Sequence, residues 1–85
     1  MINLFHRTKA DRELELLAEK IDSNVANNYK DAAQDYLRQY EKRLEELKAE
    51  GKLNQRQTEH YEERLSDFKG RMKAFTHKDQ KPYWT

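Results

Sequence analysis

The side chains best suited to chemistry in this sequence lie around residue 60. His60 and Glu63 stand three residues apart, a spacing used by metal-binding carboxylates and histidines in helical bundles. Glu59 and Glu62 lie beside them. A metal site of this kind also needs acids that point inward from several helices, whereas His60 adjoins the apolar position Tyr61 and most nearby acids point outward. We therefore interpret His60 as a solvated histidine and predict no metal and no other cofactor.

No pattern of residues indicates an enzyme. The two serines, Ser23 and Ser66, have no supporting histidine pattern, so a nucleophilic triad is not expected. The two glycines, Gly51 and Gly70, lie 19 residues apart and form no phosphate-binding loop. A chain of 85 residues is also too small to enclose an active-site pocket by itself. We predict a protein without catalytic activity or a small-molecule substrate.

The C-terminal region carries the strongest charge bias. Its five basic residues and one acid, Asp79, give it a net charge of +4, and aromatic residues are interleaved among them. The basic residues are Lys69, Arg71, Lys73, Lys78 and Lys81. Basic and aromatic side chains together bind phosphates and stack on bases, so contact with nucleic acid or another anionic surface is one functional hypothesis. Lysines near the C-terminus of a helix also serve its dipole and its solubility, which is the alternative interpretation.

Composition indicates a single small domain in a reducing compartment. The chain has 17 Lys and Arg against 16 Asp and Glu, two glycines, one proline and no cysteine. Near-zero net charge and few helix breakers favour an ordered chain with a shallow core over a disordered one. The N-terminus lacks the apolar run of a signal peptide, and no segment is apolar enough to span a membrane. We expect a cytoplasmic protein without membrane partners.

A first helix is predicted to begin after Thr8. Thr8 and Asp11 have the spacing of a capping box, in which each side chain binds the other residue's backbone N–H. The apolar residues that follow recur at helical spacing and form a stripe of Leu14, Leu17, Ala18, Ile21 and Val25, with Leu16 outside it.

The end of this helix is left with two alternatives. Residues 22–28 are rich in Asp, Ser and Asn, which prefer caps and turns, and we favour a break there. Apolar positions nevertheless continue from Leu14 to Leu47 at about 3.67 residues per turn, and neither glycine nor proline interrupts them. A single helix over residues 8–50 is therefore the alternative.

The segment from residue 28 to 50 carries a row of tyrosines. Tyr29, Tyr36 and Tyr40 share one face with leucines and alanines, where a ring can be buried while its hydroxyl reaches water. Such a row marks the margin of a core or a binding surface. We predict that these three tyrosines, together with Tyr83 and Trp84 near the C-terminus, form a partner interface.

A helical hairpin is predicted at Gly51. Glycine readily adopts the left-handed conformation that ends helices, Leu53 can fold back on Leu47, and Asn54 with Gln57 has the spacing of a second capping box. The helix that follows runs from about residue 55 to 75. Its apolar ladder steps by four and three residues, as in a coiled coil, through Tyr61, Leu65, Phe68, Met72 and Phe75.

These elements predict an all-α fold. We expect a small three-helix bundle built on an antiparallel hairpin that turns at Gly51, as one domain over residues 1–85 with an N-terminal arm (1–7) and a C-terminal tail (76–85). The alternative is one long helix, 8–50, plus a helix over 55–75, dimerising into a helical bundle. Because the apolar set is small, we expect a homodimer or a protein partner to add burial. The hypothesis is a helical interaction or adaptor module.

Overall fold

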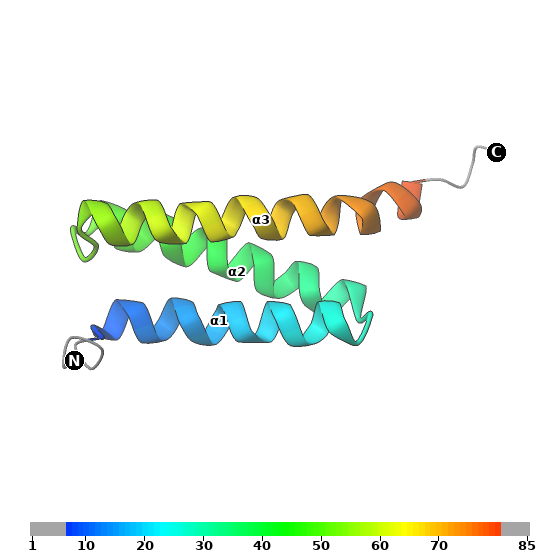
Figure 1. The fold of residues 1–85 in the computed structure, drawn as a ribbon, viewed down its shortest axis with the longest axis horizontal. Coiled ribbons are helices and arrows are strands. Elements are labelled where there is room, and N and C mark those ends of the chain that lie inside the picture. The colour runs from blue at the N-terminus through cyan, green and yellow to red at the C-terminus, as the bar shows by residue number, and fades with distance from the viewer. Residues whose placement is uncertain (1–6, 81–85) are drawn as a thin grey trace.

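The computed structural model describes residues 7–80, with side-chain positions for residues 7–73. These residues form three helices and no strand: α1 (Lys9–Ala26), α2 (Lys30–Ala49) and α3 (Gln55–Gln80). In Figure 1 the helices lie side by side, and α2 runs opposite to α1 and α3. The predicted all-α three-helix bundle is confirmed.

Capping explains where α1 begins. The backbone N–H of Thr8 donates to the Asp11 carboxylate at 3.0 Å, and the N–H of Asp11 donates to the Thr8 hydroxyl at 3.1 Å. These bonds satisfy donors that a helix N-terminus leaves without intrahelical partners, and the acid also complements the positive end of the helix dipole. The predicted capping box of Thr8 and Asp11 is therefore present.

The end of α1 is a tight turn at Asn28, which has a φ of 62°. The N–H of Tyr29 donates to the carbonyl of Asn24, and the N–H of Asn28 donates to that of Val25, as in a Schellman motif. Asparagine tolerates this left-handed conformation better than most residues. The break falls in the predicted interval, and α1 and α2 are two helices in place of the alternative single helix.

The same kind of turn ends α2. Gly51 has a φ of 70°, its N–H donates to the carbonyl of Lys48, and the N–H of Lys52 donates to that of Leu47. Leu53 packs back against the core. Asn54 then caps α3, because its side chain accepts from the N–H of Gln57 at 2.8 Å and the Gln57 amide oxygen accepts from the N–H of Asn54.

α3 is longer than the sequence analysis predicted. It ends at Gln80 and not near Phe75. The intervening residues contain neither glycine nor proline, and the first proline is Pro82, so no residue there stops the helix. The predicted tail (76–85) therefore starts five residues too early, and residues 81–85 lie outside the described part of the chain, as does the N-terminal arm before Arg7.

In the core, α1 and α2 pack closely against each other, and larger side chains fill the space between this pair and α3. α1 and α2 are the most closely packed pair, which suits the buried alanines Ala18 on α1 and Ala33 on α2. Larger side chains fill the space toward α3, where the ring of Tyr40 meets that of Phe68 edge-on with centroids 5.6 Å apart. The main buried cluster comprises Ala10, Leu14, Ala18, Ile21, Tyr40, Leu44, Leu47, Tyr61 and Phe68.

Candidate functional site

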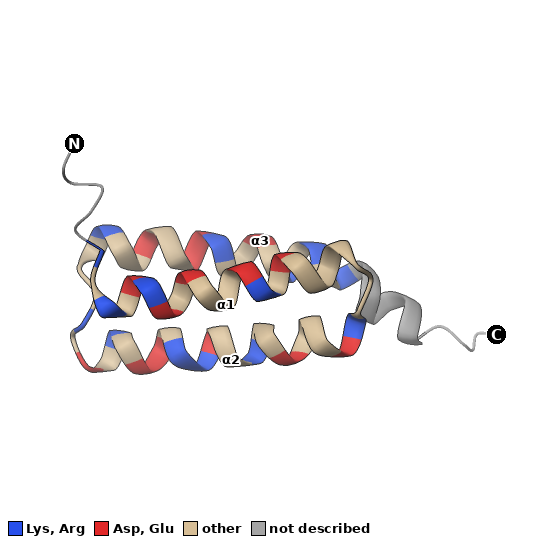
Figure 2. Ribbon diagram, turned by 90° about the horizontal axis from the view of Figure 1, so that it is seen from below, with Lys and Arg blue, Asp and Glu red and all other residues tan. Residues whose placement is uncertain are grey.

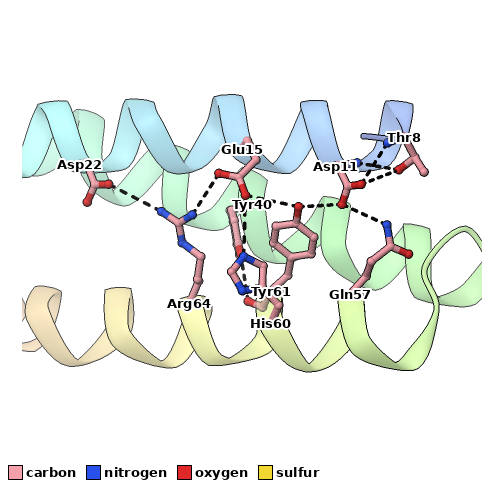
Figure 3. A network of polar contacts seen from close by, with 9 residues as sticks. All are labelled: Thr8, Asp11, Glu15, Asp22, Tyr40, Gln57, His60, Tyr61 and Arg64. Carbon is pink, nitrogen blue, oxygen red and sulfur yellow. Dashed lines mark hydrogen bonds and ion pairs between the residues drawn. The ribbon is translucent and has the colours of Figure 1, made fainter. Parts of the chain in front are cut away.

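The densest set of polar side chains lies between α1 and α3. Both signs of charge are spread along all three helices (Figure 2), but at this contact acids project from α1 toward polar and basic groups on α3 (Figure 3). We call this the α1–α3 seam. It comprises Asp11, Glu15 and Asp22 on α1 and Gln57, His60, Tyr61, Arg64 and Arg71 on α3.

One end of the seam is centred on the carboxylate of Asp11. The Tyr61 hydroxyl donates to it at 2.7 Å and the Gln57 side-chain amide at 3.0 Å, in addition to the capping bonds from Thr8. Burial alone would raise the pKa of Asp11, but the hydrogen bonds from Thr8, Tyr61 and Gln57 outweigh it and lower that pKa. The carboxylate is thus saturated with donors and leaves no free lone pair for catalysis.

The two buried tyrosines, Tyr40 and Tyr61, have raised pKa values. Burial raises the pKa of Tyr61, and the hydrogen bond to Asp11 and the negative charges of Asp11 and Glu15 raise it further. Burial also raises the pKa of Tyr40, whose hydroxyl donates to the backbone carbonyl of Tyr61 at 2.9 Å. Both phenols are therefore neutral hydrogen-bond donors that tie helices together.

The other end of the seam is a chain of alternating charges. Arg64 pairs with Glu15 at 3.0 Å and lies 3.7 Å from Asp22, which Arg71 contacts at 2.7 Å. The guanidinium groups of Arg64 and Arg71 each lie 5.5 Å from the ring centroid of Phe68, within the range of a cation–π contact. The two arginines thus cover the core and pair with α1 at the same time.

The predicted tyrosine interface is not a single surface. Tyr40 is fully buried and belongs to the core, so assigning it to a partner interface was wrong. Tyr36 is half-buried and lies 5.7 Å from the Lys20 ammonium, while Tyr29 is 62 % exposed. Tyr83 and Trp84 lie outside the described residues. The large apolar side chains exposed within the described residues are Tyr29 and Leu16.

The basic residues proposed for nucleic acid are mostly paired where the structure describes them. Lys69 contacts Glu41 at 3.0 Å, Arg71 contacts Asp22, and Lys73 is exposed. The side chain of Lys78 and the whole of Lys81 lie outside the described residues. Because two of the three described cations already have acidic partners within the chain, the arrangement lends little support to a phosphate-binding surface.

The region around His60 has the geometry of an open surface. The His60 side chain is 54 % exposed, as predicted, and its Nε2 lies 3.8 Å from a Glu15 oxygen. Glu63 is exposed. No group of three or more His, Cys, Asp or Glu residues in the described part of the chain is arranged to hold a metal ion.

A depression also lies beside His60. It has a volume of about 300 Å³ and is lined by Asp11, Asn54, Arg56, Gln57, His60 and Tyr61. The Asp11 carboxylate and the Tyr61 phenol in this lining bond to each other.

Sequence reasoning missed the seam, although its spacing was visible. The acids of α1 follow steps of four and seven residues, and the polar positions of α3 follow steps of four, three and seven, so each set falls on one face of its helix. These positions are Asp11, Glu15 and Asp22, and Gln57, Tyr61, Arg64 and Arg71. The missing information was that α1 and α3 are neighbours in space.

No protein-family model, curated protein or solved structure matches this chain. None of the helices in the described part of the chain combines the length and the apolar composition needed to cross a membrane.

Proposed function

We propose that this chain is a non-enzymatic helical interaction module that docks a helix of a partner protein, in the simplest case a second copy of itself. The observation that carries the proposal is the length of α3, which has 26 residues against 18 in α1 and 20 in α2. At 1.5 Å per residue α3 is about 9 Å longer than α2. Figure 1 shows its last turns running past the connection between α1 and α2.

An exposed apolar side chain stands at the same end of the bundle. Tyr29 is the N-cap residue of α2, at the α1–α2 connection, and is 62 % exposed. Tyrosine is enriched in protein interfaces, so this exposed ring is a candidate contact for a partner. A helix laid beside the projecting end of α3 would cover Tyr29 as well. Two copies related by a two-fold axis would present the same end to each other, which makes a homodimer the simplest assembly.

The remaining polar chemistry of the molecule supports a structural role. The acids and bases of the α1–α3 seam contact one another, and within the described residues no buried side-chain polar atom lacks a partner. Side chains used in this way stabilise the bundle that presents the projecting helix. Their hydrogen-bonding groups are already engaged within the bundle, which favours a structural role over substrate binding.

The test is the mass of the protein in solution by light scattering at micromolar concentrations. We expect twice the 10.3 kDa of the chain, and a return to the monomer mass on deletion of residues 76–85. Deletion of residues 81–85 alone removes Tyr83 and Trp84 but keeps the helical end of α3. Comparing the two deletions shows whether association depends on the aromatic tail or on the helical end. Tyr29→Ser should weaken association, whereas Leu16→Ser, a matched change on the outer face of α1, should not.

Two results would contradict the proposal. One is a monomer at every concentration together with no protein captured from the native host. The other is salt-sensitive retention of mixed-sequence DNA or RNA that is lost on neutralising Lys73 and Lys78, which would favour the nucleic-acid alternative.

A further inference from the structure

The buried positions of α2 and α3 share one heptad register across the turn that separates them. Tyr40 and Tyr61 are 21 residues apart, which is three heptads, and both are buried. Leu47 and Phe68 are buried too and have the same separation. From Leu47, alternate steps of four and three residues pass through Gly51 in the turn and lead back to Tyr61. If the turn became helical, the buried residues of α2 and α3 would lie on one face of one helix, separated on that face by Gly51, Asn54 and Thr58.

The turn between α1 and α2 lacks this property. Leu14 and Ile21 are buried and one heptad apart. The next positions in their series are Asn28, Asp35 and Lys42, none of which belongs to the buried core. A strict heptad repeat would therefore not keep the buried residues of α1 and α2 on one face, although an apolar stripe at about 3.67 residues per turn does run through this turn. The heptad register is kept across the connection at Gly51 and is not kept across the connection at Asn28.

We propose that two copies of this chain associate by exchanging α3, with Gly51 as the hinge. In the exchanged dimer α2 and α3 form one long helix, and each α3 packs on the α1–α2 hairpin of the other copy. Every contact of the α1–α3 seam is kept, but between chains. A second copy is the partner that fits best, because it supplies the same seam residues in the same register.

The local structure suits a hinge at this position. Gly51 adopts a φ of 70°, and a Cβ built there would meet no atom within 4 Å, so the space around this residue does not hinder a change of its backbone conformation. α3 is joined to α1 by ion pairs and hydrogen bonds such as Arg71–Asp22 and buries Tyr61 and Phe68 in the core, whereas α1 and α2 pack closely. α3 is therefore the helix that can be exchanged while the close contact of α1 and α2 stays in place, provided that the α3 of the other copy restores the burial of Tyr61 and Phe68. This exchange is independent of the docking end proposed above, which lies at the opposite end of the bundle.

The first experiment changes the hinge. Gly51→Ala places a side chain in the left-handed conformation, which is costly only in the closed turn, and alanine favours the extended helix. We expect the dimer dissociation constant to fall about tenfold per hinge, and thus on the order of a hundredfold per dimer. Gly70→Ala is the matched control, since Gly70 is helical in both forms and has open space around it. A Gly51→Ala protein that remains monomeric and only melts earlier would overturn the proposal.

The second experiment identifies which chain contributes α3. Asp22→Arg and Arg71→Asp each place like charges opposite each other when α3 packs on its own chain. After the two variants are unfolded and refolded together, exchange places opposite charges at positions 22 and 71 in both seams of a mixed dimer. Native mass spectrometry of the mixture, alone and with Gly51→Ala added, should show more mixed dimer than random pairing gives. Random or absent pairing in both backgrounds would mean that any dimer forms without exchange.

The two proposals fail separately. Loss of the dimer on deletion of residues 76–85, with no response to Gly51→Ala, supports docking through the projecting end and rejects exchange. A dimer that tightens with Gly51→Ala and is unaffected by Tyr29→Ser supports exchange and rejects docking through that end.

Discussion

α1 makes two contacts of opposite character. Toward α2 it presents short apolar side chains, including Ala18, and the helices approach closely. Toward α3 it presents carboxylates, and the contact consists of hydrogen bonds and ion pairs over a ring such as Phe68. The first contact depends mainly on shape, with one ion pair between Glu13 on α1 and Arg43 on α2, and should therefore respond less to pH and salt. The second depends on charge and can be weakened without damage to the first.

The largest effect should come from the apolar side of this comparison. Leu14 is fully buried on α1, whereas Leu16, two residues away, is 53 % exposed. Leu14→Ala should lower the free energy of unfolding by about 2–5 kcal/mol, because it removes buried atoms and leaves a cavity. Leu16→Ala should change it by less than about 0.5 kcal/mol. Urea unfolding followed by circular dichroism would measure both, and equal losses would mean that α1 is not packed as described.

An intermediate effect is expected for Tyr61→Phe. The lost hydroxyl donates to the Asp11 carboxylate, and hydrogen bonds to charged groups contribute about 1.5–3 kcal/mol. Tyr29→Phe is the matched control, because it removes the hydroxyl of an exposed ring that makes no capping bond at the start of α2. A loss no larger than that of the control would show that the bond between Tyr61 and Asp11 contributes nothing.

The loss of stability caused by Tyr61→Phe should change with pH in a direction set by two shifted pKa values. The pKa of Asp11 is lowered in the folded protein, so its contribution is present above its ordinary value of 3.8 and is lost as the pH falls through the folded pKa. The deficit of Tyr61→Phe should therefore shrink in acid. The pKa of Tyr61 is raised, so its contribution is present below the ordinary value of 10.0 and declines above it. Above pH 10, the free energy of unfolding of the wild type should fall more steeply than that of Tyr61→Phe, by up to about 1.4 kcal/mol per pH unit.

The two contacts also differ in how far the sequence predicted them. Apolar periodicity located the stripe of α1, and the signals at Thr8, Gly51 and Asn54 located helix ends, because these depend on neighbours in the chain. The burial of Tyr40 could not be predicted, since a tyrosine row fits both a core margin and a surface until the third helix is placed against it.

The same limit applies to the candidate site. The spacing of acids on α1 and bases on α3 was readable, but nothing local states that Asp22 and Arg71 meet across 49 residues of chain. Isolated charges on a helix are ordinarily solvated, so pairing across two helices becomes a prediction only after the handedness and order of the bundle are known. The extra length of α3 was missed for a simpler reason, because weak apolarity after Phe75 was mistaken for a helix end.

The smallest effect belongs to the exposed end of the seam. The Arg71 and Asp22 side chains are 45 % and 47 % exposed, so solvent screens their attraction, and such pairs contribute about 0–1 kcal/mol. Arg71→Gln should therefore cost little, and the cost should fall further in molar salt because the Debye length shortens to about 3 Å. The loss in Leu14→Ala should be the same in low and high salt. If salt changed the two variants equally, the division of α1 into a shape-dependent and a charge-dependent contact would not hold.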